Sequence, residues 1–470
     1  MFKKIQRIHF VGIGGIGMSG IAELLINRGY QVTGSDLRAS AITDRLAALG
    51  GTISIRHSPE NVHGANVVVI SSAVRPDNVE IVEARKRQIP VIPRAEMLAE
   101  LMRLKYAVAV AGSHGKTTTT SMIATVLAHG GLDPTMVIGG RLNTIGGNAK
   151  LGTGEYLVAE ADESDGSFLK LSPTLAVVTN IDREHLDHYP GLAEIQAAFA
   201  QFVNKVPFYG AAVLCLDDPN VQAIIPKVER RVISYGTCKQ ANLIASRIEF
   251  RGYGCSYRVH YQNELLGTVG LRVPGLHGVL NSLAAIAIGL ELDVPMEKII
   301  PALRDFQNAD RRFQIKGEKT GVLVVDDYGH HPTEIAATLS AARAAGDRRI
   351  VAVFQPHRYT RVRALEEEFA RAFNDADVVI VLPIYAAGED AIPGVSAERL
   401  AGLLKEFGHR NVKYASGFPA ALEILEESLR DGDLLITLGA GDVGKVGEAW
   451  MASGATKPPD PARKKNPAEK

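Results

Sequence analysis

The sequence predicts an α/β protein of about three domains. Its 470 residues correspond to several domains at roughly 100–200 residues each. Hydrophobic residues make up 46% and charged residues 22% of the chain, which is typical of a folded globular protein. Short apolar runs alternate with helical sequence along most of the chain, as they do in a parallel sheet with crossover helices. The 46 glycines show no short repeat, which favours tight turns and ligand loops of the kind that bind nucleotides or phosphates.

The alternating pattern falls into three series. In residues 6–104, the runs IHFVGI, YQVTGSD and NVVVISSAV alternate with helices expected over 18–28 and 40–49. The second series begins at YAVAVAGSHGKTTTT and includes segment 243–273, whose alternation predicts antiparallel strands. The third runs from GVLVVDDYGHH through RIVAVFQPHR to DLLITLGAGDVG. We therefore expect domains over residues 1–104, 105–312 and 313–455, followed by a proline-rich disordered tail over 456–470.

Charge and cysteine content narrow the partners and the location. The 52 basic and 52 acidic residues cancel, which disfavours a nucleic-acid partner held by phosphate neutralisation. Cys215, Cys238 and Cys255 show no Cys-x-x-Cys spacing, so a reducing compartment fits better than a disulfide framework. Arg7 and His9 interrupt the first apolar stretch, and no stretch reaches the roughly 20 apolar residues of a membrane span. We expect a cytoplasmic protein with no membrane partner, and the sequence leaves monomer and homodimer open.

The strongest local motif is a phosphate loop. Ala111-Gly112-Ser113-His114-Gly115-Lys116-Thr117-Thr118 follows the apolar strand YAVAVA and opens a helix. Glycines let backbone N–H groups turn toward phosphate oxygens, the helix N-terminus adds its positive end, and the lysine reaches the β- and γ-phosphates. The hydroxyl of Thr117 can bind Mg²⁺. Counted from Gly112, the loop is shorter than G-x-x-x-x-G-K-[ST], although Ala111 can take the first small-residue position.

Two further strand ends carry polar residues. Glu160-Ala161-Asp162-Glu163-Ser164-Asp165 follows the strand EYLVA, and Asn180 and His185 follow the strand TLAVVT. An acidic loop alone is more often a solvated strand end. Beside a phosphate loop in the same domain it indicates a magnesium site, because Mg²⁺ bound to ATP requires carboxylate ligands.

Two G-x-G-x-x-G matches occur. Gly12-Ile13-Gly14-Gly15-Ile16-Gly17 follows the strand IHFV, and Asp36 closes the next strand, as in a dinucleotide-binding fold. The second, Gly439-Ala440-Gly441-Asp442-Val443-Gly444, follows DLLITL. Two dinucleotides in addition to a phosphate loop would be too many. We interpret the second match as structural turn glycines and the first as a cradle for a diphosphate.

The third series also carries candidate ligand residues. Asp326-Asp327-Tyr328-Gly329-His330-His331-Pro332-Thr333-Glu334 follows the strand VLVV, and Pro332 is well placed to open a helix. Gln355-Pro356-His357-Arg358-Tyr359-Thr360-Arg361 follows the strand VAVF. Guanidinium groups pair with carboxylates or phosphates, so Arg358 and Arg361 suggest an anionic ligand. Surface arginines and a partly buried histidine pair are the alternative.

Taken in order, these motifs resemble the Mur ligases of peptidoglycan synthesis, and within them the branch that adds L-alanine. The resemblance extends to about residue 455 and rests on GIGGIGMSG, GSHGKTTTT, EADESD, TNIDREHLDHY, GLHGVLNSLAA, DDYGHHPTE, QPHRYTR and LGAGDVG. It implies an amide ligase that uses ATP and Mg²⁺ to join L-alanine to UDP-N-acetylmuramate. The implied architecture has a Rossmann-like UDP-sugar domain, a central phosphate-loop ATPase domain with a mostly parallel sheet, and a Rossmann-like domain for the amino acid.

The resemblance also implies roles for individual residues. It assigns Gly112 to Thr118 to the ATP phosphates, with Lys116, Glu160 and His185 as catalytic residues and Thr117, Glu160 and His185 as magnesium ligands. His277 and Asn281 fall in the adenine region, and Arg312 and Asp327 approach the nucleotide from the third domain. The remaining implied contacts are Tyr328, His330, Arg358 and Arg361 for L-alanine, and Gly14, Gly15, Gly17, Asp36, Ser71, Ser72 and Arg94 for the UDP-sugar.

One departure from the wider family bears on the choice of branch. Sister ligases carry a carbamoylated lysine about fifteen positions after the magnesium histidine, where this chain has Phe199. The alanine-adding branch is similar in lacking it. A ligase that attaches a whole tripeptide to the same UDP-sugar shares nearly all of these motifs and stays an alternative. Outside the family, a nicotinamide dehydrogenase leaves the phosphate loop unexplained, and a non-enzymatic ATP-binding regulator leaves the acidic and arginine loops without a role.

Overall fold

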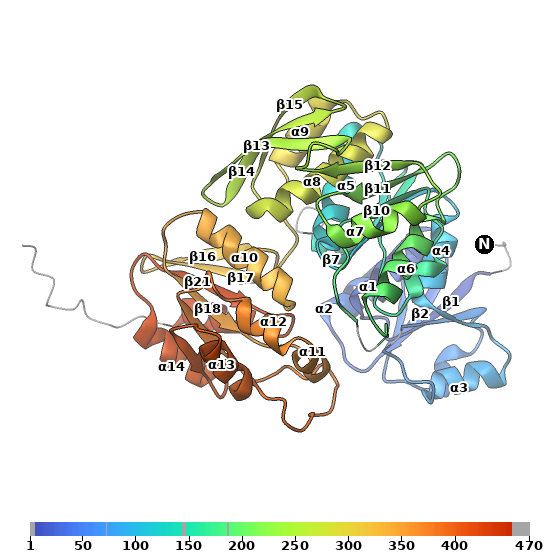
Figure 1. Cartoon of the computed structure of the whole chain (residues 1–470). Coiled ribbons are helices and arrows are strands. Elements are labelled where there is room, and N and C mark those ends of the chain that lie inside the picture. The colour runs from blue at the N-terminus through green and yellow to red at the C-terminus, as the bar shows by residue number, and fades with distance from the viewer. Residues whose placement is uncertain (1–4, 72, 143–146, 186–187, 454–470) are drawn as a thin grey trace, which may run out of the picture. The chain divides into compact units, whose positions relative to one another are not determined.

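The computed structural model describes residues 5–71, 73–142, 147–185 and 188–453. These residues form two compact units (Figure 1). The first comprises Met1–Gln314, His331–Asp347 and Arg363–Leu365, and the second comprises Ile315–His330, Arg348–Val362 and the chain from Glu366 onward. The expected tail over 456–470 lies outside the described residues, as does Ser72.

The first sheet of the first unit is parallel, with strand order β3-β2-β1-β4-β5. Its strands are β1 (Arg7–Val11), β2 (Gln31–Asp36), β3 (Thr52–Ile55), β4 (Val67–Ile70) and β5 (Val91–Pro93). The accompanying helices are α1 (Ile16–Asn27), α2 (Ala41–Ala48), α3 (Val79–Lys86) and α4 (Arg94–Met102). Central strand β1 is buried on both faces, as its apolar run IHFV predicts for a sheet covered on both sides.

The second sheet of the first unit has the order β15-β14-β13-β12-β11-β10-β6-β9-β7-β8. Its strands are β6 (Tyr106–Ala111), β7 (Thr135–Leu142), β8 (Gly147–Lys150), β9 (Tyr156–Glu160), β10 (Leu175–Val178), β11 (Ala211–Cys215), β12 (Val232–Gly236), β13 (Leu243–Arg251), β14 (Gly254–Tyr261) and β15 (Glu264–Leu271). Its helices are α5 (Lys116–Gly130), α6 (Leu192–Val203), α7 (Pro219–Ile224), α8 (Gly275–Glu291) and α9 (Met296–Arg304). The pairing of β13, β14 and β15 is antiparallel, which confirms the expectation for segment 243–273.

Alternate residues of the central strands face two different cores, because successive side chains of a strand point to opposite faces. Val108 and Val110 of β6 pack in one apolar cluster with α5, α8 and α9. Ala107 and Ala109 pack in the other cluster, with α6. Figure 1 shows α5 and α8 on one side of this sheet and α6 and α7 on the other. Buried on both faces, β6 holds the start of the phosphate loop in a fixed place.

The second unit is built on a sheet of order β16-β17-β21-β18-β19-β20. Its strands are β16 (Gln314–Lys319), β17 (Val322–Asp327), β18 (Ile350–Phe354), β19 (Val378–Val381), β20 (Val412–Tyr414) and β21 (Leu434–Leu438). Its helices are α11 (Tyr359–Ala364), α12 (Glu366–Arg371), α13 (Ala397–Glu406), α14 (Phe418–Ser428) and α15 (Gly444–Ala452). The pairs formed among β17, β21, β18, β19 and β20 are parallel.

Helix α10 (Pro332–Ala344) begins at Pro332, as the sequence predicts. The sequence places this stretch in the third series, yet it clusters with the first compact unit. Among the described residues, no helix combines the length and hydropathy needed to cross a membrane.

Candidate active site

The phosphate loop has the backbone that its glycines predict. It leaves β6 and enters α5 with Gly112 at φ +135° and Gly115 at φ +78°, both in the region that favours glycine. A Cβ on Gly112 would lie 2.0 Å from the hydroxyl of Thr179, and one on Gly115 would lie 2.7 Å from Oδ1 of Asn281. Neither position can accept a side chain, because the loop packs closely against Thr179 and Asn281.

Asn180, at the end of β10, clamps the loop from the neighbouring strand. Its Oδ1 accepts the backbone N–H of His114 at 2.8 Å, and its Nδ2 donates to the carbonyl of His114 at 2.9 Å. The hydroxyl of Thr179 donates to the same carbonyl at 2.6 Å. The sequence predicts that Asn180 lies at the same edge of the sheet as the phosphate loop, and in the structure its hydrogen bonds hold the loop in place.

Lys116 points into a buried acidic environment. Its Nζ donates to the carbonyls of Gly112 at 2.6 Å and Ser113 at 3.1 Å, and to Oε1 of Glu163 at 2.8 Å. Burial alone lowers the pKa of Lys116, but the charge of Glu163 outweighs burial and raises it above its usual value. The ammonium group is thus held charged beside the loop.

Carboxylates gather next to the loop in the same unit. The hydroxyl of Thr117 donates to the carboxylate of Glu160, with distances of 3.0 and 3.2 Å to its two oxygens. Glu163, only 2% exposed, lies 3.4 Å from Nε2 of His185. With Glu184, these two residues present ligand atoms within 4.8 Å of one another. The hydrogen bond to Glu163 raises the pKa of His185 despite the opposing effect of burial.

The sequence predicts Glu160 as the ligand from the acidic loop and does not indicate Glu163 or Glu184. Four acids within residues 160–165 give no local signal of which one turns inward, and Glu184 lies among other charged residues after β10. In the structure, Glu163 turns inward and forms an ion pair with Lys116.

Of the two residues predicted for the adenine region, Asn281 lies beside the phosphate loop. Asn281 on α8 is 6% exposed and borders Gly115. Burial and the nearby charge of Arg312 lower the pKa of His277 to about 4, so its ring is neutral at pH 7. Arg312 belongs to the same unit and lies 3.6 Å from Oε1 of Glu334. Asp327 belongs to the second unit.

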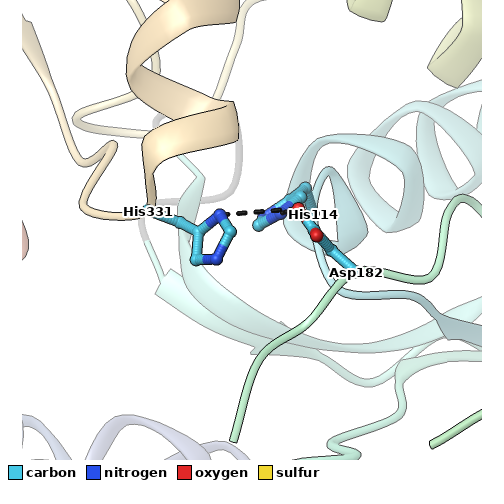
Figure 2. A group of neighbouring side chains, drawn as sticks. All are labelled: His114, Asp182 and His331. Atoms are coloured by element: carbon cyan, nitrogen blue, oxygen red, sulfur yellow. Dashed lines mark hydrogen bonds and ion pairs between the residues drawn. The ribbon is translucent and has the colours of Figure 1, made fainter. Parts of the chain in front are cut away.

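The structure also brings together three residues that the sequence analysis did not combine. His114 of the phosphate loop, Asp182 after β10 and His331 before α10 turn toward one another (Figure 2). Nε2 of His114 is 2.9 Å and Nδ1 of His331 is 3.5 Å from Oδ2 of Asp182. Burial lowers the pKa of His114, but its contacts with Asp182 and Glu334 outweigh this and raise it to about 10.

A cavity of about 620 Å³ opens beside the N-terminal glycine loop. Gly14, Gly15, Asp36 and Ser71 line it, as the sequence predicts for a ligand site. The backbone N–H of Gly14 donates to Oδ2 of Asp36 at 2.9 Å, so the predicted carboxylate is partly occupied in holding the loop. The cavity is also lined by His57, which the sequence analysis missed.

Gly17 and Arg94 are not among the residues that line this cavity. A Cβ on Gly17 would lie 2.6 Å from Nη1 of Arg94, and Arg94 forms an ion pair with Asp162 at 2.9 Å. Gly17 therefore makes room for an arginine that reaches the acidic loop after β9.

A buried carboxylate supports the cavity from behind. Glu80 is fully buried and accepts hydrogen bonds from Ser35 at 2.6 Å and Asn61 at 2.6 Å. His57 lies 3.2 Å and His9 3.7 Å from it. Burial raises the pKa of Glu80, but the hydrogen bonds from His9, Ser35 and Asn61 lower it to about 2. Glu80 therefore stays ionised and orients His57 at the cavity wall.

The second unit holds its own group of aromatic and cationic side chains. His357 stacks on Tyr385 with ring centres 5.5 Å apart, and His330 meets it edge-on at 5.6 Å. Nη1 of Arg361 lies 3.3 Å from Nδ1 of His357. Arg358 has φ +68°, and its N–H donates to the carbonyl of Tyr385. Burial, followed by the charges of His330 and the arginines, lowers the pKa of His357 to about 3, which makes it a neutral support between cationic groups.

Nearby positions of the same unit have structural roles. Tyr328 packs against His330 at 5.4 Å, and Asp327 accepts the backbone N–H of Gly329. A Cβ on Gly441 would lie 2.3 Å from Oε1 of Gln355. This close approach agrees with the interpretation of the second glycine motif as structural.

Phe199, at the place where sister ligases carry a lysine, is a core residue. It is 1% exposed on α6 and packs edge-on against Phe168 at 5.3 Å. An apolar ring in that position offers no ligand for a metal ion.

The comparisons with known proteins cover nearly the whole chain. Family models match for the Mur ligase family catalytic domain over residues 7–106, the Mur ligase middle domain over 110–289 and the Mur ligase glutamate ligase domain over 311–441. A UDP-N-acetylmuramate–L-alanine ligase from Geotalea daltonii is 59% identical over 95% of this chain and 98% of its own. One from Desulfatibacillum aliphaticivorans is 59% identical over 96% of this chain and 100% of its own.

Solved structures agree. The UDP-N-acetylmuramate–alanine ligase from Thermotoga maritima matches with a TM-score of 0.80 at 30% identity, over 95% of this chain and 98% of that one. A murein peptide ligase from Psychrobacter arcticus shares the fold, with a TM-score of 0.70 at 24% identity over 95% and 98% of the two chains. The expected three-domain α/β fold is confirmed, and the chain belongs to the Mur ligase family.

Proposed function

We propose that this protein joins L-alanine to UDP-N-acetylmuramate at the expense of ATP, as a step in the synthesis of peptidoglycan precursors. The observation that carries the proposal is 59% identity, over almost the full length of both chains, to enzymes named for this reaction. The buried phosphate loop beside a group of carboxylates supports the use of ATP. A cytoplasmic site of action is in keeping with three cysteines that show no pairing pattern.

The donors beside the phosphate loop fit Mg²⁺. Thr117 and Glu160 bring a hydroxyl and a carboxylate together, and oxygen donors are the ligands that Mg²⁺ prefers. Oε2 of Glu163 is buried, with no hydrogen-bond partner among the described residues. Thr117, Glu160 and His185 would hold the magnesium ions. When bound, Mg²⁺ supplies positive charge to the phosphate oxygens of ATP.

The protein's own residues then have separate tasks. The lactyl carboxylate of the sugar is a poor electrophile, and ATP converts it to an acyl phosphate with release of ADP. Lys116 places its charge beside the phosphoryl group in transfer, where charge stabilisation has the largest effect. The amine of L-alanine attacks the acyl carbon, a C–N bond forms and phosphate leaves.

The remaining contacts of the proposal follow the side chains already described. Gly14, Gly15, Asp36 and Ser71 would contact the UDP-sugar in the 620 Å³ cavity, with His57 at its wall. His277, Asn281 and Arg312 would border the adenine, and Asp327 the nucleotide. Arg358 and Arg361, with Tyr328 and His330, would hold the carboxylate of L-alanine and orient its amine. We propose that the chain has three domains, over residues 1–104, 105–312 and 313–455.

Phosphate release in the presence of ATP and UDP-N-acetylmuramate tests the proposal, with L-alanine compared against the tripeptide L-alanyl-D-glutamyl-diaminopimelate. We expect release with L-alanine and little with the tripeptide. The opposite preference would favour the tripeptide ligase. Release with neither amine, from protein shown to be folded, would contradict both assignments.

A further inference from the structure

Beside the phosphate loop, three ligand atoms converge that the proposed reaction does not use together. They are Nε2 of His114, Oδ2 of Asp182 and Nδ1 of His331, and all lie within 4.8 Å of one another (Figure 2). They come from the phosphate loop, the segment after β10 and the residue before α10, all of them in the first compact unit. Their side chains are 12%, 28% and 4% exposed, so the group is largely shielded from water.

The spacing suits a small tetrahedral ion. Metal–ligand distances of about 2.0 Å place neighbouring ligand atoms of a tetrahedron about 3.3 Å apart. Nε2 of His114 is 2.9 Å and Nδ1 of His331 is 3.5 Å from the shared oxygen of Asp182. Shifts of a few tenths of an ångström would bring both distances to the tetrahedral value.

The groups behind the ligands also match a metal site. A histidine that binds a metal through one ring nitrogen usually donates its other N–H to a carboxylate. Nδ1 of His114 is buried and lies 3.5 Å from Oε1 of Glu334. The other oxygen of Asp182, Oδ1, accepts the backbone N–H of Arg183 at 2.7 Å. A carboxylate therefore lies beside the second nitrogen of His114, and the backbone of Arg183 orients the carboxylate of Asp182.

The contacts of His331 indicate that its Nδ1 carries no proton. Its Nδ1 accepts the backbone N–H of Thr333 as the cap of α10, at 3.4 Å. A neutral ring nitrogen that accepts a hydrogen bond carries a lone pair and no proton, so Nδ1 has no proton to donate to Asp182, and a metal ion at Nδ1 would replace its 3.4 Å contact with the N–H of Thr333. The hydroxyl of Thr333 already donates to the same Oδ2 at 2.6 Å.

We propose that His114, Asp182 and His331 form a binding site for one divalent transition-metal ion of the zinc class, separate from the magnesium ligands. Two imidazoles and one carboxylate are ligands that suit Zn²⁺, Ni²⁺ or Cu²⁺ better than Mg²⁺. A bound ion would tie the phosphate loop to the N-terminus of α10 and stabilise the folded chain against heat, because it binds the native state alone.

The test is a Zn²⁺ titration of the full-length protein against a chelating dye, in millimolar Mg²⁺ and without substrates. Asp182→Asn and His331→Asn each remove one ligand, and asparagine preserves the helix cap at position 331. His129→Asn is the matched control, because His129 is an exposed histidine in the same unit. His185→Asn tests the other imidazole–carboxylate group. Tm with and without Zn²⁺ is measured on the same samples.

We expect one Zn²⁺ per chain, bound with micromolar or tighter affinity and accompanied by a rise in Tm. Asp182→Asn and His331→Asn should each weaken binding by about 100-fold or more and abolish the rise in Tm, whereas His129→Asn and His185→Asn should retain both. Absence of micromolar binding, or tight binding that is lost in His185→Asn and kept in His331→Asn, would overturn the proposal. Since no substrate is present, the outcome is independent of the proposed ligase activity.

Discussion

Lys116→Ala is expected to damage both turnover and stability, for two different reasons. The Nζ of Lys116 lies 2.8 Å from Oε1 of Glu163, and the two side chains are 16% and 2% exposed. Removing the lysine leaves a buried carboxylate with much of its charge uncompensated. Loss of one partner of a buried ion pair costs about 3–5 kcal/mol. Because Lys116 is partly exposed and His185 remains 3.4 Å from Glu163, we expect about 3 kcal/mol of lost unfolding free energy.

The loss of turnover has a separate origin in the transition state. A preorganised group that stabilises developing charge contributes roughly 10²–10³-fold to kcat. The double variant Lys116→Ala/Glu163→Gln separates the two effects, since it removes the unpaired charge without restoring the cation. It should regain most of the lost stability while kcat stays at least about 10²-fold below that of the unaltered protein.

The assays are urea unfolding for stability and phosphate release for turnover. Lys105→Ala is the matched control, because the Nζ of Lys105 also donates to two backbone carbonyls, those of Gly152 and Gly154. Lys105 precedes β6, at the opposite end of that strand from the phosphate loop. It should leave kcat unchanged. Near-normal turnover in Lys116→Ala would refute the assignment of the phosphate loop. A double variant no more stable than Lys116→Ala would refute the buried-pair argument.

Three further predictions concern metal, amino acid and pH. Glu160→Ala and His185→Ala should each raise the Mg²⁺ concentration that gives half-maximal activity, because each removes a proposed ligand. If this concentration is unchanged in both variants, these residues do not bind magnesium and the acidic loop is only a solvated strand end. Arg358→Lys or Arg361→Lys should raise KM for L-alanine about tenfold with ATP affinity unchanged, because an ammonium cannot replace the two hydrogen bonds of a guanidinium to a carboxylate. Use of alaninamide, a poor substrate because it lacks the carboxylate, should be little affected. An equal loss of activity with L-alanine and alaninamide would argue against a carboxylate contact. The pKa of Glu80 is about 2 in the folded state against a usual 4.5, so Glu80 contributes stability above pH 4.5 that is lost as the pH falls toward 2. Glu80→Gln should therefore reduce the dependence of the unfolding free energy on pH between 4.5 and 2. An unchanged dependence in this variant would contradict the lowered pKa.

The sequence predicts those parts of the fold and site that local pattern determines. The strand–glycine–lysine–helix order at residues 106–130 places the phosphate loop, because glycine conformation and the helix start are set by neighbouring residues. The alternation in segment 243–273 likewise predicts the antiparallel strands.

Long-range contacts account for what the sequence misses. The hydroxyl of Thr333 donates a hydrogen bond to Asp182, 151 positions away in the sequence. Nothing in the motif around either residue indicates that the two side chains meet. Glu163 is one of four acids in its loop, and Glu80 lies on helix α3 with no motif around it. Their importance arises from burial, which is decided by the packing of distant segments.

The central claim is that ATP activates the carboxylate of the sugar before the amine attacks. The most direct measurement uses UDP-N-acetylmuramate carrying ¹⁸O in both oxygens of its lactyl carboxylate, with ATP and L-alanine, and mass spectrometry of the released phosphate. Formation of an acyl phosphate transfers one of these oxygens to phosphorus, and attack of the amine releases it. The account predicts one ¹⁸O in each phosphate and one in the new amide. Amide product accompanied by phosphate without ¹⁸O would contradict it.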